Sequence, residues 1–113
     1  MQIDMFIRQR IAQLRMHQGV SENQMSRELG HSAAYLSNLS TQQKLPSYRS
    51  LAEICDYFDI TLSQFFDEDC EYPVEVSELL KEAKKARPET LRAVLYVLKN
   101  LNKADAYPDA VGD

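Results

Sequence analysis

The cysteines and histidines are the residues of this sequence that most readily bind metals or act as nucleophiles and bases. Cys55 and Cys70 lie fifteen positions apart without a CxxC pair, and neither His17 nor His31 stands at a ligand spacing from them. No paired carboxylates, nucleophile with a base, or phosphate-binding loop can be recognised. The sequence therefore predicts no enzyme, no metal site and no cofactor, and Cys55 is expected as a reduced thiol inside a helical core.

Residues 21–39, SENQMSRELGHSAAYLSNL, predict two short helices that meet at a tight turn. Ser21 with Gln24 has the spacing of a capping box, which opens the first of these helices, and Gly30 ends it. Ser32 can cap the second helix, AAYLSNL. Because only about three residues separate the two helices, we expect them to cross at a steep angle.

The residues before this pair predict a further helix at the N-terminus. Its apolar face recurs at helical spacing and ends at Gly19; the apolar residues are Ile7, Ile11 and Leu14. The arginines between them predict a basic outer face; they are Arg8, Arg10 and Arg15.

The residues after the pair predict four more helices. Ser47 is expected to cap the fourth helix, and Thr61 with Gln64 forms a second capping box that opens a short fifth one. An acidic connector follows, and residues 74–86 and 88–102 then predict two helices, with Pro88 at a first helical position.

These elements predict an all-α protein with a five-helix domain at residues 1–69 and a C-terminal two-helix extension at residues 70–113. A tail from about residue 104 is expected to fray. The last helix carries a stripe that must be buried against its own domain or a second copy, and dimerisation is expected through it: Leu91, Val94, Leu95, Leu98 and Leu101.

Composition and charge indicate the class of protein and the kinds of partner that it could bind. The chain has 113 residues, 44% of them apolar, which is typical of one soluble globular domain, and no run is long enough to span a membrane. No secretory signal is recognisable, so a cytoplasmic location is expected. The net charge is −4, yet residues 1–49 hold six bases against three acids, and residues 50–69 hold six acids and no base. The acidity therefore does not exclude a nucleic-acid partner.

The order of caps, glycines and apolar positions over residues 5–67 resembles the lambda repressor and Cro family of helix-turn-helix domains, also called the xenobiotic response element family. The ending TLSQFF matches a common close of that domain. The supporting residues are Ile11, Leu14, Arg15, Gly19, Ser21, Met25, Leu29, Gly30, Ser32, Leu36, Leu39, Pro46, Leu51, Ile54, Phe58 and Leu62.

The resemblance implies that the third helix enters the major groove of double-stranded DNA and that a dimer matches two half-sites about 34 Å apart. Carried over by position, the residues implied to read base edges are Ala33, Ala34, Ser37 and Asn38. Those implied to contact phosphates are Ser21, Asn23, Thr41, Gln43 and Lys44, with Tyr35 either a further phosphate contact or a partly buried core ring.

The sequence departs from the family pattern in three ways. Glu22 stands where a Gln is common, and phosphate repels its carboxylate. Ser40 stands where a Glu often pairs with the arginine that is here Arg15, so Arg15 is either free to reach a phosphate or bonded elsewhere. Ala33 and Ala34 cannot form bidentate hydrogen bonds, although a methyl can pack on thymine and Asn38 can pair with adenine.

The sequence thus predicts a sequence-specific, DNA-binding transcriptional regulator, a repressor, which acts as a homodimer on a palindromic operator. The alternative is a protein-interaction module of the same fold, antitoxin-like or partner-docking, which acts through the acidic segment 50–69 and the apolar C-terminal stripe.

Overall fold

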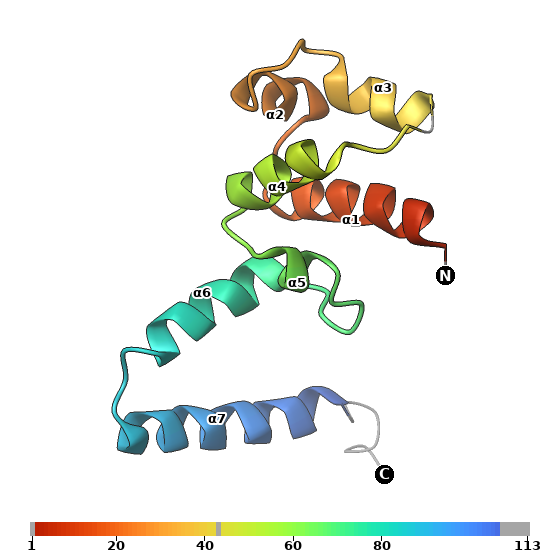
Figure 1. Cartoon of the computed structure of the whole chain (residues 1–113). Helices are drawn as coiled ribbons and strands as arrows, with labels where there is room; N and C mark the ends of the chain where they lie inside the picture. Colours follow the sequence, from red (N-terminus) through yellow and green to blue (C-terminus); the bar gives the residue numbers. More distant parts are fainter. Residues whose placement is uncertain (1, 43, 107–113) are drawn as a thin grey trace. The chain divides into compact units, whose positions relative to one another are not determined.

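The structure is a computed structural model that describes residues 2–42 and 44–106, and over these residues it contains seven α-helices and no strand (Figure 1). The prediction of an all-α fold is confirmed. The helices are α1 (Ile3–His17), α2 (Glu22–Glu28), α3 (Tyr35–Thr41), α4 (Tyr48–Tyr57), α5 (Leu62–Phe65), α6 (Pro73–Ala83) and α7 (Pro88–Ala106).

The chain divides into two compact units, one ending at Ser77 and the other beginning at Glu78, within α6. The start of α6 belongs to the first unit, because Pro73 and Ser77 are buried and Val74 packs against the core. The Ser77 hydroxyl also donates to the carbonyl of Asp59 at 3.3 Å.

All five helices of the predicted five-helix domain contribute to one core. Leu14 of α1, Met25 of α2, Ile54 of α4 and Phe65 of α5 are each at most 1% exposed, and Leu36 brings α3 to the same cluster. Each such side chain contributes roughly 1.5–3 kcal/mol through burial. The sequence predicted these core positions because apolar residues at helical spacing fall on one face.

Two glycines end the first two helices by leaving the right-handed conformation. Gly19 has a φ of +67° and Gly30 a φ of +84°, as predicted from their positions. The next amide in each case reaches back to the helix: Val20 donates to Arg15, and His31 donates to Ser26, both at 3.0 Å.

Side-chain caps start three of the helices. Ser47 accepts a hydrogen bond from the Ser50 amide at 3.1 Å, and Thr61 with Gln64 forms the complete predicted capping box. At Ser21 only half of the predicted box is present, because the hydroxyl accepts from the Gln24 amide. The Gln24 side chain turns away from the cap and donates to the Glu28 carboxylate at 3.5 Å.

The two cysteines are both free, and Cys55 is 2% exposed within the core. Burial, and to a smaller extent the charge of Asp56, raise the pKa of the Cys55 thiol to about 11, so it is protonated at neutral pH. The prediction of a reduced, core-packed thiol is confirmed. Cys70 is half-buried.

The prediction that Arg10 belongs to a basic outer face of α1 is wrong. Its side chain is only 4% exposed, and its guanidinium donates to three backbone carbonyls at the end of the first unit. Nε bonds Phe65 at 2.8 Å, Nη1 bonds Cys70 at 2.8 Å, and Nη2 bonds Asp67. The guanidinium also lies 5.1 Å from the ring centroid of Phe6. Arg10 therefore points inward because it is the donor for the carbonyls at and after the end of α5.

The second unit exposes many apolar side chains. Every side chain of α7 that the structure describes is exposed, and the predicted stripe is 38–56% exposed. α7 begins at Pro88, as predicted, and continues to Ala106, so most of the predicted frayed tail lies outside the described residues. No described helix is sufficiently long and apolar to cross a membrane.

We predict that Arg10→Met lowers the free energy of unfolding by about 3 kcal/mol, because three carbonyls lose a charged donor at once. Urea unfolding followed by circular dichroism would measure the loss. Arg8→Met is the matched control, since Arg8 lies two residues earlier at a half-buried position of the same helix, and its effect should stay below ~1 kcal/mol. Similar small losses in both variants would contradict the role of Arg10.

Candidate nucleic-acid interface

A shallow open groove lies between the starts of α2 and α3, and we call it the α2/α3 groove. It is lined by Glu22, Asn23, Ala33, Ala34 and Ser37. Three of the four predicted base-reading residues therefore meet one of the predicted phosphate contacts, Asn23, in one depression. The fourth, Asn38, is exposed on α3 next to Ser37.

The start of α3 differs from the prediction. α3 begins at Tyr35, with Ala34 as its N-cap residue, so six residues separate it from α2 and not about three. Ser32 does not cap the helix with its side chain; its carbonyl accepts from the Tyr35 amide at 3.0 Å in a turn. Ala33 and Ala34 consequently lie in the connection before the helix, and Ser37 and Asn38 lie on it.

The cap that Ser32 was predicted to supply comes from α2. The Ser26 hydroxyl accepts a hydrogen bond from the Leu36 amide at 3.0 Å and donates to the Glu22 carbonyl at 2.6 Å. Ser26 is fully buried. One hydroxyl thus joins the backbones of the two helices that form the groove.

The polar side chains of α3 differ in which hydrogen-bonding groups they can offer a base. Ser37 donates to the Ala34 carbonyl at 3.1 Å, and Thr41 donates to the Ser37 carbonyl at 2.9 Å. Their oxygens are left mainly as acceptors. Asn38 is exposed, and its side-chain amide forms no bond to another described residue, so it can both donate and accept.

The predicted phosphate contacts are mostly exposed. Ser21, Asn23, Thr41 and Lys44 are exposed, whereas Gln43 lies outside the described residues. Tyr35 is half-buried, packs against the core, and stacks on His31 with ring centroids 3.8 Å apart. The core-ring interpretation of Tyr35 therefore has direct support from its contacts.

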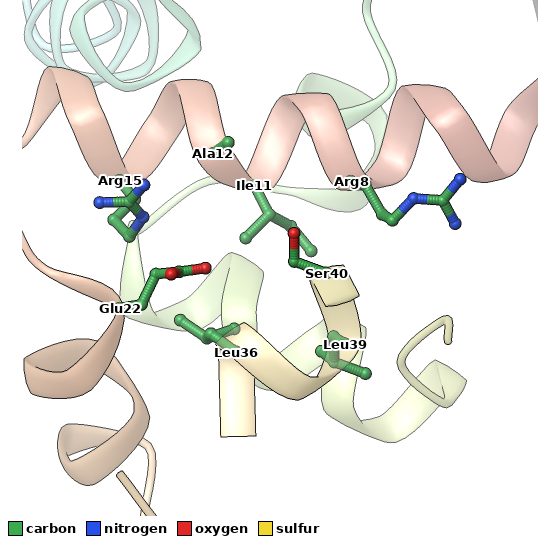
Figure 2. Close-up of a pocket in the computed structure, with 8 residues that line it drawn as sticks. All are labelled: Arg8, Ile11, Ala12, Arg15, Glu22, Leu36, Leu39 and Ser40. Carbon is green, nitrogen blue, oxygen red and sulfur yellow. The ribbon is translucent and has the colours of Figure 1, made fainter. Parts of the chain in front are cut away.

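Arg15 and Glu22 share a second, smaller pocket, which Figure 2 shows between α1 and α3. The Glu22 carboxylate lies at the same end of this pocket as the Arg15 guanidinium, while Arg8 extends away at the other end (Figure 2). Arg15 Nη1 donates to the Val20 carbonyl at 3.0 Å, so at least one of its donors is bonded within the chain. Ser40 lines the pocket where the family often has a glutamate.

Residues 10–71, more than half of the chain, match the family described as the Cro/C1-type HTH DNA-binding domain. The chain belongs to this family. No curated protein and no solved structure matches the chain.

Membership of the Cro/C1-type family implies DNA binding and a role in transcriptional regulation, and the family is not an enzymatic one. The matched range contains the residues on both sides of the α2/α3 groove. It also contains Arg10 and all of its hydrogen-bond partners, the last of which is Cys70. The resemblance seen in the sequence is thereby confirmed.

Two contacts that support this Cro/C1-type domain were missed from the sequence. Ser26 could have been noticed as a serine in the middle of a short helix, where its hydroxyl commonly bonds the carbonyl four residues earlier. The Tyr57 hydroxyl of α4 donates to the Glu28 carboxylate at the end of α2. Burial, followed by this bond and the charge of Glu28, raise the pKa of Tyr57 to about 12, so the bond persists at neutral pH.

The acidic segment 50–69 contributes no residue to the α2/α3 groove. Its acids are all exposed and lie on α4 and after α4 and α5: Glu53, Asp56, Asp59, Asp67, Glu68 and Asp69. Among the residues that line the groove, Glu22 is therefore the one whose carboxylate would face a phosphate backbone there.

Proposed function

We propose that this protein is a sequence-specific transcriptional repressor that binds a palindromic operator as a homodimer, in the cytoplasm. The observation that carries the proposal is the α2/α3 groove, which gathers three of the four residues implied to read bases and one of those implied to contact phosphates, in a domain of this family. Repression needs no further chemistry, because a protein that occupies an operator excludes others from it.

Base reading in this proposal depends on few hydrogen bonds. Asn38 supplies the one amide, which suits adenine, and Ser37 accepts from a base amino group. Ala33 and Ala34 offer only methyl groups, which can pack on thymine methyls. We therefore expect an operator rich in A·T pairs, with part of the selectivity coming from the shape of the DNA.

Phosphate binding is expected to be modest. Lys44 is the one cation among the predicted phosphate contacts, and the hydroxyl of Ser21 and the amide of Asn23 are uncharged donors. Arg15 was not among these contacts, and its Nη1 donates to the Val20 carbonyl within the chain. With few cations to displace counterions, the affinity should depend only weakly on salt.

The dimer is proposed to form through α7. Four residues of the apolar stripe, Leu91, Val94, Leu98 and Leu101, follow the alternating three- and four-residue spacing of a helix-pairing seam. An identical helix presents the same spacing, so a second copy fits this face by symmetry. A helix whose described side chains are all exposed also needs such a partner for stability.

We predict that Asn38→Ala reduces the discrimination between operator and unrelated duplexes by roughly tenfold, because one bidentate base contact accounts for about 1–3 kcal/mol. Selection from a random duplex library with the wild-type chain would define the operator. Titrations of both duplexes at low and physiological salt would then measure the change.

Lys44→Ala is the matched control, since it should weaken binding to all duplexes alike and reduce the salt slope by about one. Equal losses on all duplexes for both variants would refute direct base reading. If the wild-type chain enriched no duplex, the protein-interaction function would replace the proposal, and segment 50–69 would be tested for a partner.

We predict that replacing Leu95 and Leu98 together with glutamate yields a folded monomer that loses at least tenfold in operator affinity, since each half-site then binds alone. Sedimentation velocity would give the oligomeric state, and the same titration would give the affinity. Tyr96→Glu is the control, because Tyr96 is 71% exposed and lies outside the stripe. A double variant that remained a dimer would remove α7 from the interface.

A further inference from the structure

Ser26 lies at the junction between the two helices of the α2/α3 groove. It is 0% exposed and belongs to α2, yet its hydroxyl oxygen accepts from the Leu36 amide of α3 at 3.0 Å. The hydroxyl proton is directed to the Glu22 carbonyl at 2.6 Å. The hydroxyl uses its single proton in the bond to Glu22, and its oxygen accepts from Leu36. The side chain is therefore held in one orientation.

The Leu36 amide needs this partner because α3 has no cap of its own. Ala34 stands at the N-cap position and has no side chain that could accept a hydrogen bond. The first amides of a helix lack partners within the helix, and a buried one without a partner is costly. Ser26 therefore serves α3 as an N-cap that comes from another helix.

A cap that comes from another helix stabilises α3 and also fixes the position of α3 on α2. A cap within the same loop would satisfy the amide at any angle between α2 and α3, whereas the Ser26 bond exists only while α3 lies at one place on α2. The backbone of Ser26 adds to this, since its carbonyl accepts from the His31 amide at 3.0 Å in the connection. Ser26 thus bonds both the connection, at His31, and the start of α3, at Leu36.

We propose that Ser26 is the positioning residue of α3: it sets where Ser37 and Asn38 stand relative to Asn23 across the groove. This inference rests on the proposed function for its consequence in DNA binding. Base contacts tolerate little displacement, while phosphate contacts through flexible side chains tolerate more. Loss of the hydroxyl should thus reduce discrimination between sequences more than it reduces binding to unrelated DNA.

The test is Ser26→Ala in the full chain. Alanine is smaller than serine and favours helices, so α2 should still form. We expect the Leu36 amide to exchange with deuterium at least tenfold faster in NMR spectra. We expect the ratio of operator to unrelated-duplex affinity to fall about tenfold, with binding to the unrelated duplex changed by less than twofold.

Thr61→Ala is the matched control, because it removes a hydroxyl that caps a helix away from the groove, where Thr61 accepts from the Gln64 amide at 3.0 Å. Both variants are compared at a temperature where circular dichroism shows each to be fully folded. The control should leave both the Leu36 exchange rate and the affinity ratio unchanged.

An unchanged affinity ratio in Ser26→Ala, or an equal fall in Thr61→Ala, would overturn the positioning role. Unchanged exchange at Leu36 would overturn the cap itself. A wild-type chain that preferred no duplex would instead overturn the proposed function, and the exchange rates would still decide whether Ser26 holds α3 on α2.

Discussion

The first unit depends on one buried cation. Arg10 leaves α1 and enters the far end of the domain, where its guanidinium donates to the carbonyls of Phe65, Asp67 and Cys70. A buried guanidinium is stable only when its donors are satisfied, so the chain after α5 must return to α1. That return brings Phe65 into the core, to which α2 and α3 contribute Met25 and Leu36.

The surface itself is a consequence of how α2 and α3 are joined. Gly30 ends α2 with a positive φ, and the connection then runs to Ala34 before α3 starts. The hydroxyl of Ser26 holds the start of α3, and Tyr57 of α4 bonds Glu28 at the end of α2. Both helices are only seven residues long, so these bonds and the core beneath them, more than helix propensity, keep the groove in shape.

The parts of this structure that the sequence predicted are local or periodic. Gly19, Gly30, Ser47 and the Thr61 capping box each act within a few residues, and the core stripes repeat at helical spacing. Arg10 was misplaced because arginine is usually exposed, although it stands three residues after Ile7 and four before Leu14, on their face of the helix. Besides the nearby Gln13 side chain, its partners are backbone carbonyls 55 to 60 residues away, which no side-chain pattern reveals.

The candidate site was predicted only in part, because some of its contacts are local and others join distant residues. Its residues followed from the spacing around Gly30, but the start of α3 did not, because Ser32 is a good cap by type and the actual cap comes from Ser26, ten residues before the amide it serves. Tertiary contact thus overrode the local signal. The role of each residue in DNA binding stays a prediction.

DNA binding through the α2/α3 groove is tested most directly by NMR, by adding an operator duplex to the ¹⁵N-labelled chain. We expect the largest shifts at the amides of residues 21–24 and 33–38, on both sides of the α2/α3 groove. Shifts confined to residues 50–69 and α7, or no shifts with any duplex, would contradict this expectation.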